Sequence, residues 1–227
     1  MRKIYLILLF CAIYSIELNA QKVLWDSVSR PEIYGPQLEQ YRTFKRSSKD
    51  VVFLGNSITH WTNWNELLNI SNAKNRGIPG DVTYGVIDRL DEALTSSPQK
   101  IFILIGINDV ARKVPDEVIL TNYQRIISGI KKISPRTKIY FQTMLPTNPT
   151  FKKLTNHYKN DHVIAINAGL KQLGAKNNIT VIDLYSAFVD DQGLLKKEYT
   201  YDGVHLTGPG YAVWASILTK GKYLTTN

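Results

Sequence analysis

The chain has 227 residues, of which 44% are hydrophobic and 21% are charged, and its formal net charge is +9. This length suits one domain with a sizeable hydrophobic core, and the composition is that of a folded globular protein, which excludes a disordered chain. The lysines and arginines are spread along the sequence without a nucleic-acid-binding motif, so we expect no nucleic-acid partner. A basic surface would suit an anionic glycan or lipid equally well.

Residues 1–20 have the pattern of a secretory signal peptide. The basic start "MRK" precedes the apolar run "IYLILLFCAIYSI", which is short for a membrane span, and Ala20 stands at a plausible cleavage point. An uncleaved membrane anchor is the alternative. We expect export to the periplasm or the extracellular space, with residues 21–227 forming a single domain. Cys11 lies inside the removed segment, so the mature chain would contain no cysteine, which excludes thiol catalysis and cysteine-ligated metals.

Four short apolar runs have the composition of buried strands. They are rich in β-branched residues, nearly continuous in hydrophobicity and bounded by glycine, proline or asparagine. The four runs cover residues 51–54, 101–105, 138–144 and 179–184, and a less regular candidate strand covers 73–78.

Helical periodicity separates these runs. Val82, Val86, Leu90 and Leu94 repeat every four residues after Asp81, which is a candidate N-cap. Further helices are expected at about 119–133, at about 156–176 and after 207–210.

The alternation of strands and helices predicts an α/β fold. Strand–helix–strand units produce a parallel sheet with right-handed crossovers and helices on both faces. Ligands bind such sheets at the carboxyl ends of the strands. The residues that follow each strand are therefore the candidates for a functional site.

Four segments place polar residues or glycine at these positions. Each has an ordinary structural interpretation: Ser57 and Asp202 could be caps, Gly80 and Asn108 turn residues, and His205 a packed loop residue. The segments are Gly55-Asn56-Ser57, "NRGIPGD" at 75–81, Gly106-Ile107-Asn108-Asp109, and "YDGVHLTGPGY" at 201–211.

Together these residue types are those that acyl transfer requires. A serine hydroxyl such as that of Ser57 needs an imidazole to take its proton, and His205 needs an acceptor such as Asp202 to fix its tautomer. The oxyanion that forms needs preorganised donors, which the amides of Ser57 and Gly80 and the side chain of Asn108 would supply. The sequence thus favours a serine hydrolase.

The same four segments resemble the sequence blocks of the SGNH hydrolases, the GDSL-type esterase family, in order and spacing. "FLGNSIT", "NRGIPGD", "GIND" and "DGVHL" are similar to the serine, glycine, asparagine and Asp-x-x-His blocks, and they extend over most of the expected mature chain. The resemblance implies Ser57 as nucleophile, Gly80 and Asn108 as oxyanion donors, and His205 as base oriented by Asp202. It also implies a flavodoxin-like three-layer α/β/α sandwich with a central, mostly parallel five-stranded sheet, and chemistry without a cofactor.

One position departs from the family pattern, which usually has aspartate where this chain has Asn56. Asparagine still donates and accepts hydrogen bonds in the turn, so we expect activity to survive. His60 is a competing base, but no carboxylate is placed to orient it, and we interpret it as a pocket-lining or surface residue. His157 and His162 are expected to be solvated. No histidine–carboxylate cluster has metal-ligand spacing, so no metal site is expected.

The substrate is expected to be a short-chain acyl ester, acetyl first. The sequence is most similar to the compact acetylhydrolase and sialate O-acetylesterase-like branch, and no lid-like apolar insertion is present to hold a long acyl chain. Asn56, Trp61, Trp64 and Tyr201 are candidate substrate-binding residues, because the three aromatic rings could stack on a sugar. Alternatives are a lysophospholipase or thioesterase, for which membrane contact is possible but not required, and a non-catalytic glycan-binding module. The sequence leaves the oligomeric state open.

Overall fold

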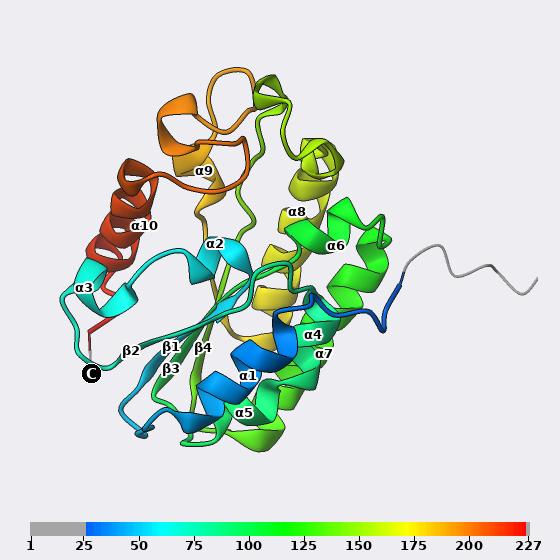
Figure 1. Cartoon of the computed structure of the whole chain (residues 1–227). Coiled ribbons are helices and arrows are strands. Elements are labelled where there is room, and N and C mark those ends of the chain that lie inside the picture. Colours follow the sequence, from blue (N-terminus) through cyan, green and yellow to red (C-terminus); the bar gives the residue numbers. More distant parts are fainter. Residues whose placement is uncertain (1–25, 226–227) are drawn as a thin grey trace, which may run out of the picture.

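A parallel sheet of five strands forms the centre of the computed structural model, which describes residues 26–225 (Figure 1). The sheet order is β2-β1-β3-β4-β5, and every neighbouring pair is parallel. This confirms the predicted flavodoxin-like architecture. The predicted signal peptide at 1–20 lies outside the described residues. The strands are β1 (Val51–Gly55), β2 (Ala73–Gly77), β3 (Lys100–Leu104), β4 (Lys138–Gln142) and β5 (Thr180–Ile182).

Helices cover both faces of this sheet (Figure 1). One face carries α1 (Tyr34–Thr43), α4 (Thr83–Asp88), α5 (Leu90–Leu94), α7 (Asp116–Ile133) and α8 (Asn160–Asn177). The other carries α3 (Trp64–Leu68) and α10 (Gly208–Lys220), which pack against each other. The short helices α2 (Ser57–His60), α6 (Ile107–Ala111) and α9 (Tyr185–Phe188) follow strands directly. No helix within residues 26–225 has the length and apolarity that a membrane crossing would need.

A row of stacked aromatic rings crosses the middle of the sheet. Phe53, Phe102 and Tyr140 are register partners on β1, β3 and β4, with ring centroids 5.0 and 4.7 Å apart. Trp64 of α3 stacks on Phe53 at 4.0 Å. All four side chains are at most 3% exposed. Such packing makes the centre of the sheet a stiff platform for the residues at its carboxyl end.

The helix predicted after Asp81 is divided in two, and Asp81 does not cap it. The N-cap of α4 is Val82, whose side chain makes no capping bond. The amide of Thr83 instead donates to the carboxylate of Asp109, 26 residues further on. The break between α4 and α5 falls at Arg89, whose guanidinium is buried against Asp81 and the carbonyl of Gly55. The predicted apolar positions are nevertheless all buried, so the periodicity holds across the break, while Asp81 pairs with Arg89 and does not cap the helix.

The order of the strands places a switch point between β1 and β3. The chain leaves β1 for β2 on one side and later returns to β3 on the other, so the carboxyl ends of β1 and β3 are adjacent, with Gly55 paired to Leu104. In open α/β sheets such a switch point leaves a crevice for a ligand. The segments containing Ser57 and Asn108 begin there.

Candidate active site

Ser57 lies in a tight turn at the end of β1. Asn56 is the N-cap of α2, and its Oδ1 accepts a hydrogen bond from the amide of Ile58 at 3.0 Å. Ser57 is the first helical residue, so its amide has no carbonyl partner within the helix. The side chain is largely buried, and its Oγ lies 2.8 Å from Nε2 of His205. The turn thus directs a hydroxyl at an imidazole that comes from a segment 148 residues away.

The loop before α10 brings Asp202 and His205 together locally. Nδ1 of His205 lies 2.6 Å from Oδ2 of Asp202. The other carboxylate oxygen accepts from the amides of Val204 and His205, at 2.9 and 2.8 Å. Thr200 closes the loop, since its hydroxyl donates to the carbonyl of His205 and accepts from the amide of Gly203. With Nδ1–H facing Asp202, Nε2 of His205 is free to accept the proton of Ser57.

The carboxyl of Asp202 is held in its ionised form. Burial acts to raise its pKa, but the hydrogen bond with the His205 ring and those from the amides of His205 and Val204 outweigh burial, so the pKa lies below its usual value of 3.8. A carboxylate in this position stabilises the imidazolium that forms during proton transfer.

Gly80 and Asn108 meet beside the serine turn. The backbone of Gly80 has a φ of 77°, a conformation that L side chains rarely adopt, and glycine is the residue that takes it without strain. Nδ2 of Asn108 donates to the carbonyl of Asp81 at 2.8 Å, which ties the asparagine segment to the glycine segment. An amide nitrogen carries two hydrogens, so Asn108 keeps one for a ligand.

Buried charges hold the glycine turn from behind. Arg89 donates through Nε to the carboxylate of Asp81 at 2.9 Å and through its terminal nitrogens to the carbonyls of Arg76 and Gly55. The side chains of Arg89 and Asp81 are both 0% exposed. Arg112 adds a bond to the carbonyl of Gly80 at 3.2 Å. The turn is thus fixed by the sheet and not by solvent-exposed contacts.

Two of the four candidate substrate-binding residues are buried. Trp64 is 1% exposed, stacks on Phe53 and lies edge-on to Trp214, so its assignment to the substrate is wrong. Its helix turns the ring towards the sheet, and the indole N–H donates to the carbonyl of Thr59. Asn56 is also 1% exposed and serves as the cap described above; its Nδ2 has no partner among the described residues.

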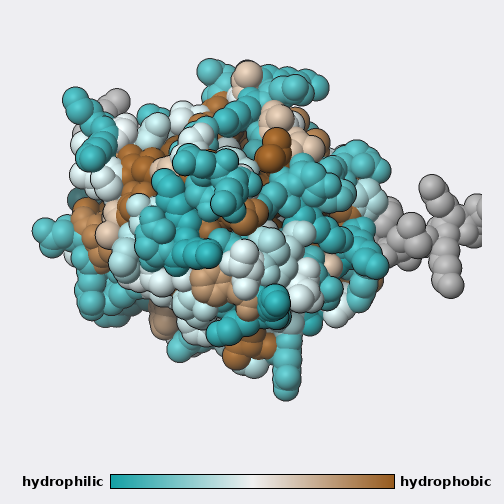
Figure 2. Space-filling view, turned by 90° about the horizontal axis from the view of Figure 1, so that it is seen from above, coloured by the Kyte–Doolittle hydropathy of each residue, from teal (hydrophilic) through white to brown (hydrophobic). Residues whose placement is uncertain are grey.

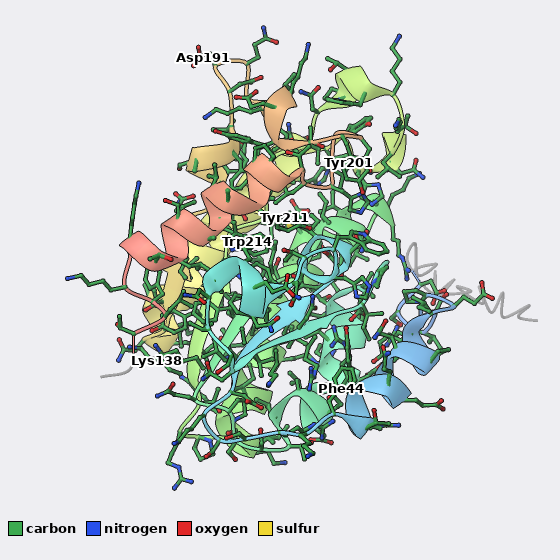
Figure 3. All side chains as sticks on the ribbon, turned by 60° about the vertical axis from the view of Figure 1, so that its left-hand side comes forward. Phe44, Lys138, Asp191, Tyr201, Tyr211 and Trp214 are labelled. Carbon is green, nitrogen blue, oxygen red and sulfur yellow. The ribbon has the colours of Figure 1, made fainter. Side chains whose placement is uncertain are left out.

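Trp61 and Tyr201 are exposed next to the catalytic residues. Their exposed fractions are 54% and 51%, and the Tyr201 ring lies parallel to that of His205 with centroids 5.9 Å apart. In Figure 3, Tyr201 lies above Tyr211 and Trp214, which belong to α10. Trp61 lines an open groove of about 610 Å³, whose other walls are Thr62, Asn63, Glu66, Leu67, Leu206, Gly208 and Tyr211.

The surface around the strand ends is mixed in polarity. Figure 2 looks down on this end of the molecule and shows hydrophobic surface as separate patches among hydrophilic side chains. A ligand approaching the groove therefore meets both aromatic and polar groups.

The other histidines have different surroundings. Nδ1 of His60 lies 2.9 Å from the carbonyl of Gly77, and the residue lines an open pocket with Tyr41 and Phe44, which confirms the interpretation as a pocket-lining residue. His162 is exposed, as expected, and pairs with Asp116 at 2.8 Å. His157 was expected to be solvated, and this is wrong: it is only partly exposed, and its Nε2 lies 3.0 Å from Oδ1 of Asn108. Nothing in the local sequence signals this contact, because 49 residues separate the two partners.

A narrow, mainly apolar pocket is lined by residues that adjoin the catalytic residues in the sequence. Ile58 and Val204 line it, and they follow Ser57 and precede His205 in the sequence. Ile107, Met144 and Leu145 provide further apolar walls. The space open to a water-sized sphere is about 10 Å³, room for about one water-sized group.

Among residues 26–225, no group of three histidine, cysteine, aspartate or glutamate side chains is arranged to hold a metal ion. The chemical groups gathered at the switch point are instead a hydroxyl, an imidazole, a carboxylate and amide donors.

Sequence and structural comparisons identify the family. The family model of the GDSL-like lipase/acylhydrolases matches residues 53–213. The chain belongs to this family. The match begins within β1 and ends within α10, so it includes every residue of the candidate site. Members of the family hydrolyse ester bonds, and the chain is a hydrolase of this group.

The most similar relatives and structures include acetylhydrolases and acylhydrolases. Subunit alpha2 of platelet-activating factor acetylhydrolase IB from Rattus norvegicus is 30% identical over 175 residues, which cover 74% of this chain and 73% of that protein. A Streptococcus pneumonia structure, provisionally assigned as a platelet activating factor, has a TM-score of 0.79 and 29% identity, covering 85% of this chain and 92% of its own. A provisionally assigned acylhydrolase from Bacteroides fragilis has a TM-score of 0.71 and 27% identity, covering 86% and 100%.

Proposed function

We propose that the protein is a serine esterase that hydrolyses short-chain acyl esters, acetyl esters first, through an acyl-enzyme on Ser57. The observation that carries the proposal is the continuous line of contacts from Ser57 Oγ to His205 Nε2 at 2.8 Å and from His205 Nδ1 to Asp202 Oδ2 at 2.6 Å. Each distance is within hydrogen-bonding reach before any substrate is bound.

The reaction follows from these positions. Ser57 Oγ attacks the ester carbonyl carbon while its proton passes to Nε2 of His205. The negative oxygen faces the amides of Ser57 and Gly80 and the free hydrogen of Asn108. When the C–O bond breaks, His205 returns the proton to the departing alcohol. A water molecule then gives a proton to His205 and attacks the acyl-enzyme, which releases the acid and restores the serine.

The Ser57→Ala variant tests the mechanism. Removal of the nucleophile is expected to lower the hydrolysis of a chromogenic acetate ester by at least about 10⁴-fold. Thermal unfolding should be unchanged, since the methyl group fits the same turn. A variant that retains more than a tenth of wild-type turnover would contradict the assignment.

The size of the pocket supports a small acyl group. Ile58, Ile107 and Val204 are at most 4% exposed and leave room for about one water-sized group, which suits the methyl of an acetyl better than a longer chain. The name of the relatives, acetylhydrolase, agrees with this choice. Chain-length profiling with acetate, butyrate and octanoate esters is expected to give the highest kcat/KM for acetate, and a preference for octanoate would contradict it.

Carbohydrate is our preferred alcohol component. Trp61 and Tyr201 expose aromatic rings beside the groove and the base, and flat rings of this kind stack on sugars. The relatives suggest a second candidate, an acetylated lipid, because they are named for platelet-activating factor. The hydrophobic patches of Figure 2 are separated by hydrophilic side chains and do not form one broad apolar face on the end shown there.

A direct competition separates the two candidates. Acetate release is measured from an acetylated xylo-oligosaccharide and from platelet-activating factor, at equal ester concentration. We expect faster release from the oligosaccharide, and a Trp61→Ala variant should raise KM for that substrate while leaving that for p-nitrophenyl acetate unchanged. Faster release from the lipid would favour the second candidate.

A non-catalytic glycan-binding module is an alternative of another class. A fluorophosphonate probe distinguishes it, because only an activated serine reacts rapidly with such a phosphorus centre. We expect labelling of the wild-type protein and none of Ser57→Ala.

A further inference from the structure

The segment between β4 and α8 contacts two parts of the candidate active site, the loop of Asp202 and His205 and the oxyanion residue Asn108. It contains the 3₁₀ turns η1 (Pro149–Phe151) and η2 (Thr155–His157). At its start, the amide of Asn148 donates to the carbonyl of Gly203 at 2.8 Å. At its end, the hydroxyl of Tyr158 donates to the carbonyl of Asp202 at 3.2 Å, and Nε2 of His157 lies 3.0 Å from Oδ1 of Asn108. Adjacent residues thus reach the acid loop and the oxyanion asparagine.

The contact with Asn108 determines which way its amide points. Nδ2 faces the carbonyl of Asp81, and Oδ1 faces Nε2 of His157. Rotating the amide by half a turn would place Oδ1 against the Asp81 carbonyl and would set its NH2 group against His157. The same rotation would present an oxygen, and not an N–H, to the developing oxyanion. Two fixed partners therefore hold the orientation in which Asn108 can donate.

Only one form of His157 makes this contact. Oδ1 accepts and cannot donate, so Nε2 must carry the hydrogen. Nδ1 is buried and forms no hydrogen bond of normal geometry among the described residues, so a proton there would be poorly satisfied. Burial first, and then repulsion by His205, lower the pKa of His157; the Leu154 carbonyl and Asp202 act in the opposite direction and are outweighed. The neutral imidazole with hydrogen on Nε2 is the stable form.

We propose that His157 is a positioning residue of the oxyanion hole, which orients the Asn108 amide through Nε2–H. The inference rests on the proposed hydrolysis and extends it, since His157 touches neither Ser57 nor the expected position of the acyl group. The inference predicts that replacing His157 lowers kcat with little effect on KM, and that this loss of kcat requires Asn108.

The loss-of-donor variants are His157→Leu and His157→Phe, of which the second keeps a flat ring in case the first fails to fold. Losing one oxyanion donor costs about 10²–10³ in kcat, so releasing its orientation is expected to cost about 10–100-fold. KM for p-nitrophenyl acetate should stay within about 3-fold, because the interaction is made in the transition state. His157→Gln, whose amide N–H can donate to the same oxygen, should recover most of the activity.

A double-mutant cycle gives the decisive readout. In an Asn108→Ala background, His157→Leu should cause no further loss beyond about 2-fold, because the group it orients is gone. If His157 had a purely structural role, the fold-losses in kcat of the two single variants would instead multiply in the double variant. His162→Leu serves as the matched control, since this exposed histidine on the neighbouring helix pairs with Asp116 away from the site, and its activity should equal that of the wild type.

Different results of these experiments would overturn the proposed function and the inference about His157. A wild-type protein that neither hydrolyses the ester nor reacts with a fluorophosphonate would overturn the proposed function, and the inference with it. If the wild type is active, any one of three results would overturn the inference alone. These are full activity in His157→Leu and His157→Phe, no recovery of activity in His157→Gln, and losses of kcat that multiply in the double-mutant cycle.

Discussion

The two halves of the candidate site are held by different kinds of structure. Ser57 and Asn108 follow neighbouring parallel strands, so the ladder between β1 and β3 fixes their spacing, while Gly80 follows β2. Asp202 and His205 lie on an irregular loop that depends on side-chain bonds from Thr200 and Tyr158. The first half gains its rigidity from the sheet, and the second from a few named hydrogen bonds.

The difference matters because the hydroxyl and the imidazole come from opposite halves. Proton transfer requires both groups to stay within hydrogen-bonding reach, and a misplacement of about 1 Å can cost about 10²-fold in rate. Changes to the buried residues that support Ser57, Gly80 and Asn108 should therefore act mainly on stability, and changes to the loop of Asp202 and His205 should act strongly on turnover. The predictions below test that division, from the largest expected effect to the smallest.

The largest effect is expected for Asp202→Asn in the loop-supported half. The new NH2 group would face Nδ1 of His205 and force the hydrogen onto Nε2, which then cannot take the proton of Ser57. The kcat for p-nitrophenyl acetate should fall by about 10⁴-fold. Circular dichroism should remain that of wild type, and thermal unfolding should fall only by the contribution of the ionised carboxylate. Retention of more than about a tenth of kcat would show that His205 does not need this carboxylate.

The sheet-supported half should respond differently to Arg89→Met. Arg89 and Asp81 form an ion pair with both side chains 0% exposed, so the substitution leaves a buried carboxylate without its partner. The free energy of unfolding should fall by about 3–5 kcal/mol. Lys171→Met is the matched control: Lys171 and Asp183 are exposed partners, and that loss should be below about 1 kcal/mol. Urea denaturation measures both, and equal losses would contradict a role for the buried pair.

The strand pattern and the four sequence segments were sufficient to predict the sheet and the meeting of Ser57 with His205. The apolar period after Asp81 predicted the buried positions, but it gave no signal of the helix break at Arg89, whose side chain bonds to a carboxylate and to carbonyls from other parts of the fold. Proximity in sequence also failed for Trp64, since the direction of a side chain on α3 depends on packing against Phe53 and Trp214. The contact of His157 with Asn108 likewise joins residues that no local pattern relates.

Asp109 and Asp202, one in each half of the site, should change the free energy of unfolding with pH in opposite directions. In the sheet-supported half, burial is the main cause that raises the pKa of Asp109 to about 7, against the opposing bonds from Thr83. The unfolded carboxyl ionises near 3.8, so between about pH 4 and 7 the folded state binds more protons and stability falls as pH rises. Asp109→Asn should remove this decline. In the loop-supported half, the pKa of Asp202 is lowered, so its contribution is present above about pH 4 and is lost as pH falls through the folded value.

Urea denaturation at several pH values tests both signs. The stability of Asp109→Asn relative to wild type should increase from pH 4.5 to pH 7.5. The stability of wild type relative to Asp202→Asn should shrink below about pH 4. Either difference changing in the other direction would contradict the environment assigned to that carboxyl.

The smallest effect is expected for Thr200→Val, which keeps the shape of the side chain and removes its hydroxyl. Thr200 is 3% exposed, donates to the carbonyl of His205 at 2.7 Å and accepts from the amide of Gly203 at 2.9 Å. Loss of these bonds should lower the free energy of unfolding by about 1–2 kcal/mol. Because the hydroxyl fixes the residues on both sides of the base, kcat should also fall, by about 10-fold. Thr121→Val, at an exposed position of α7, should change neither quantity measurably. If Thr200→Val lost stability but kept full kcat, the loop would not need its internal bonds to present His205, and the contrast between the two halves would not hold.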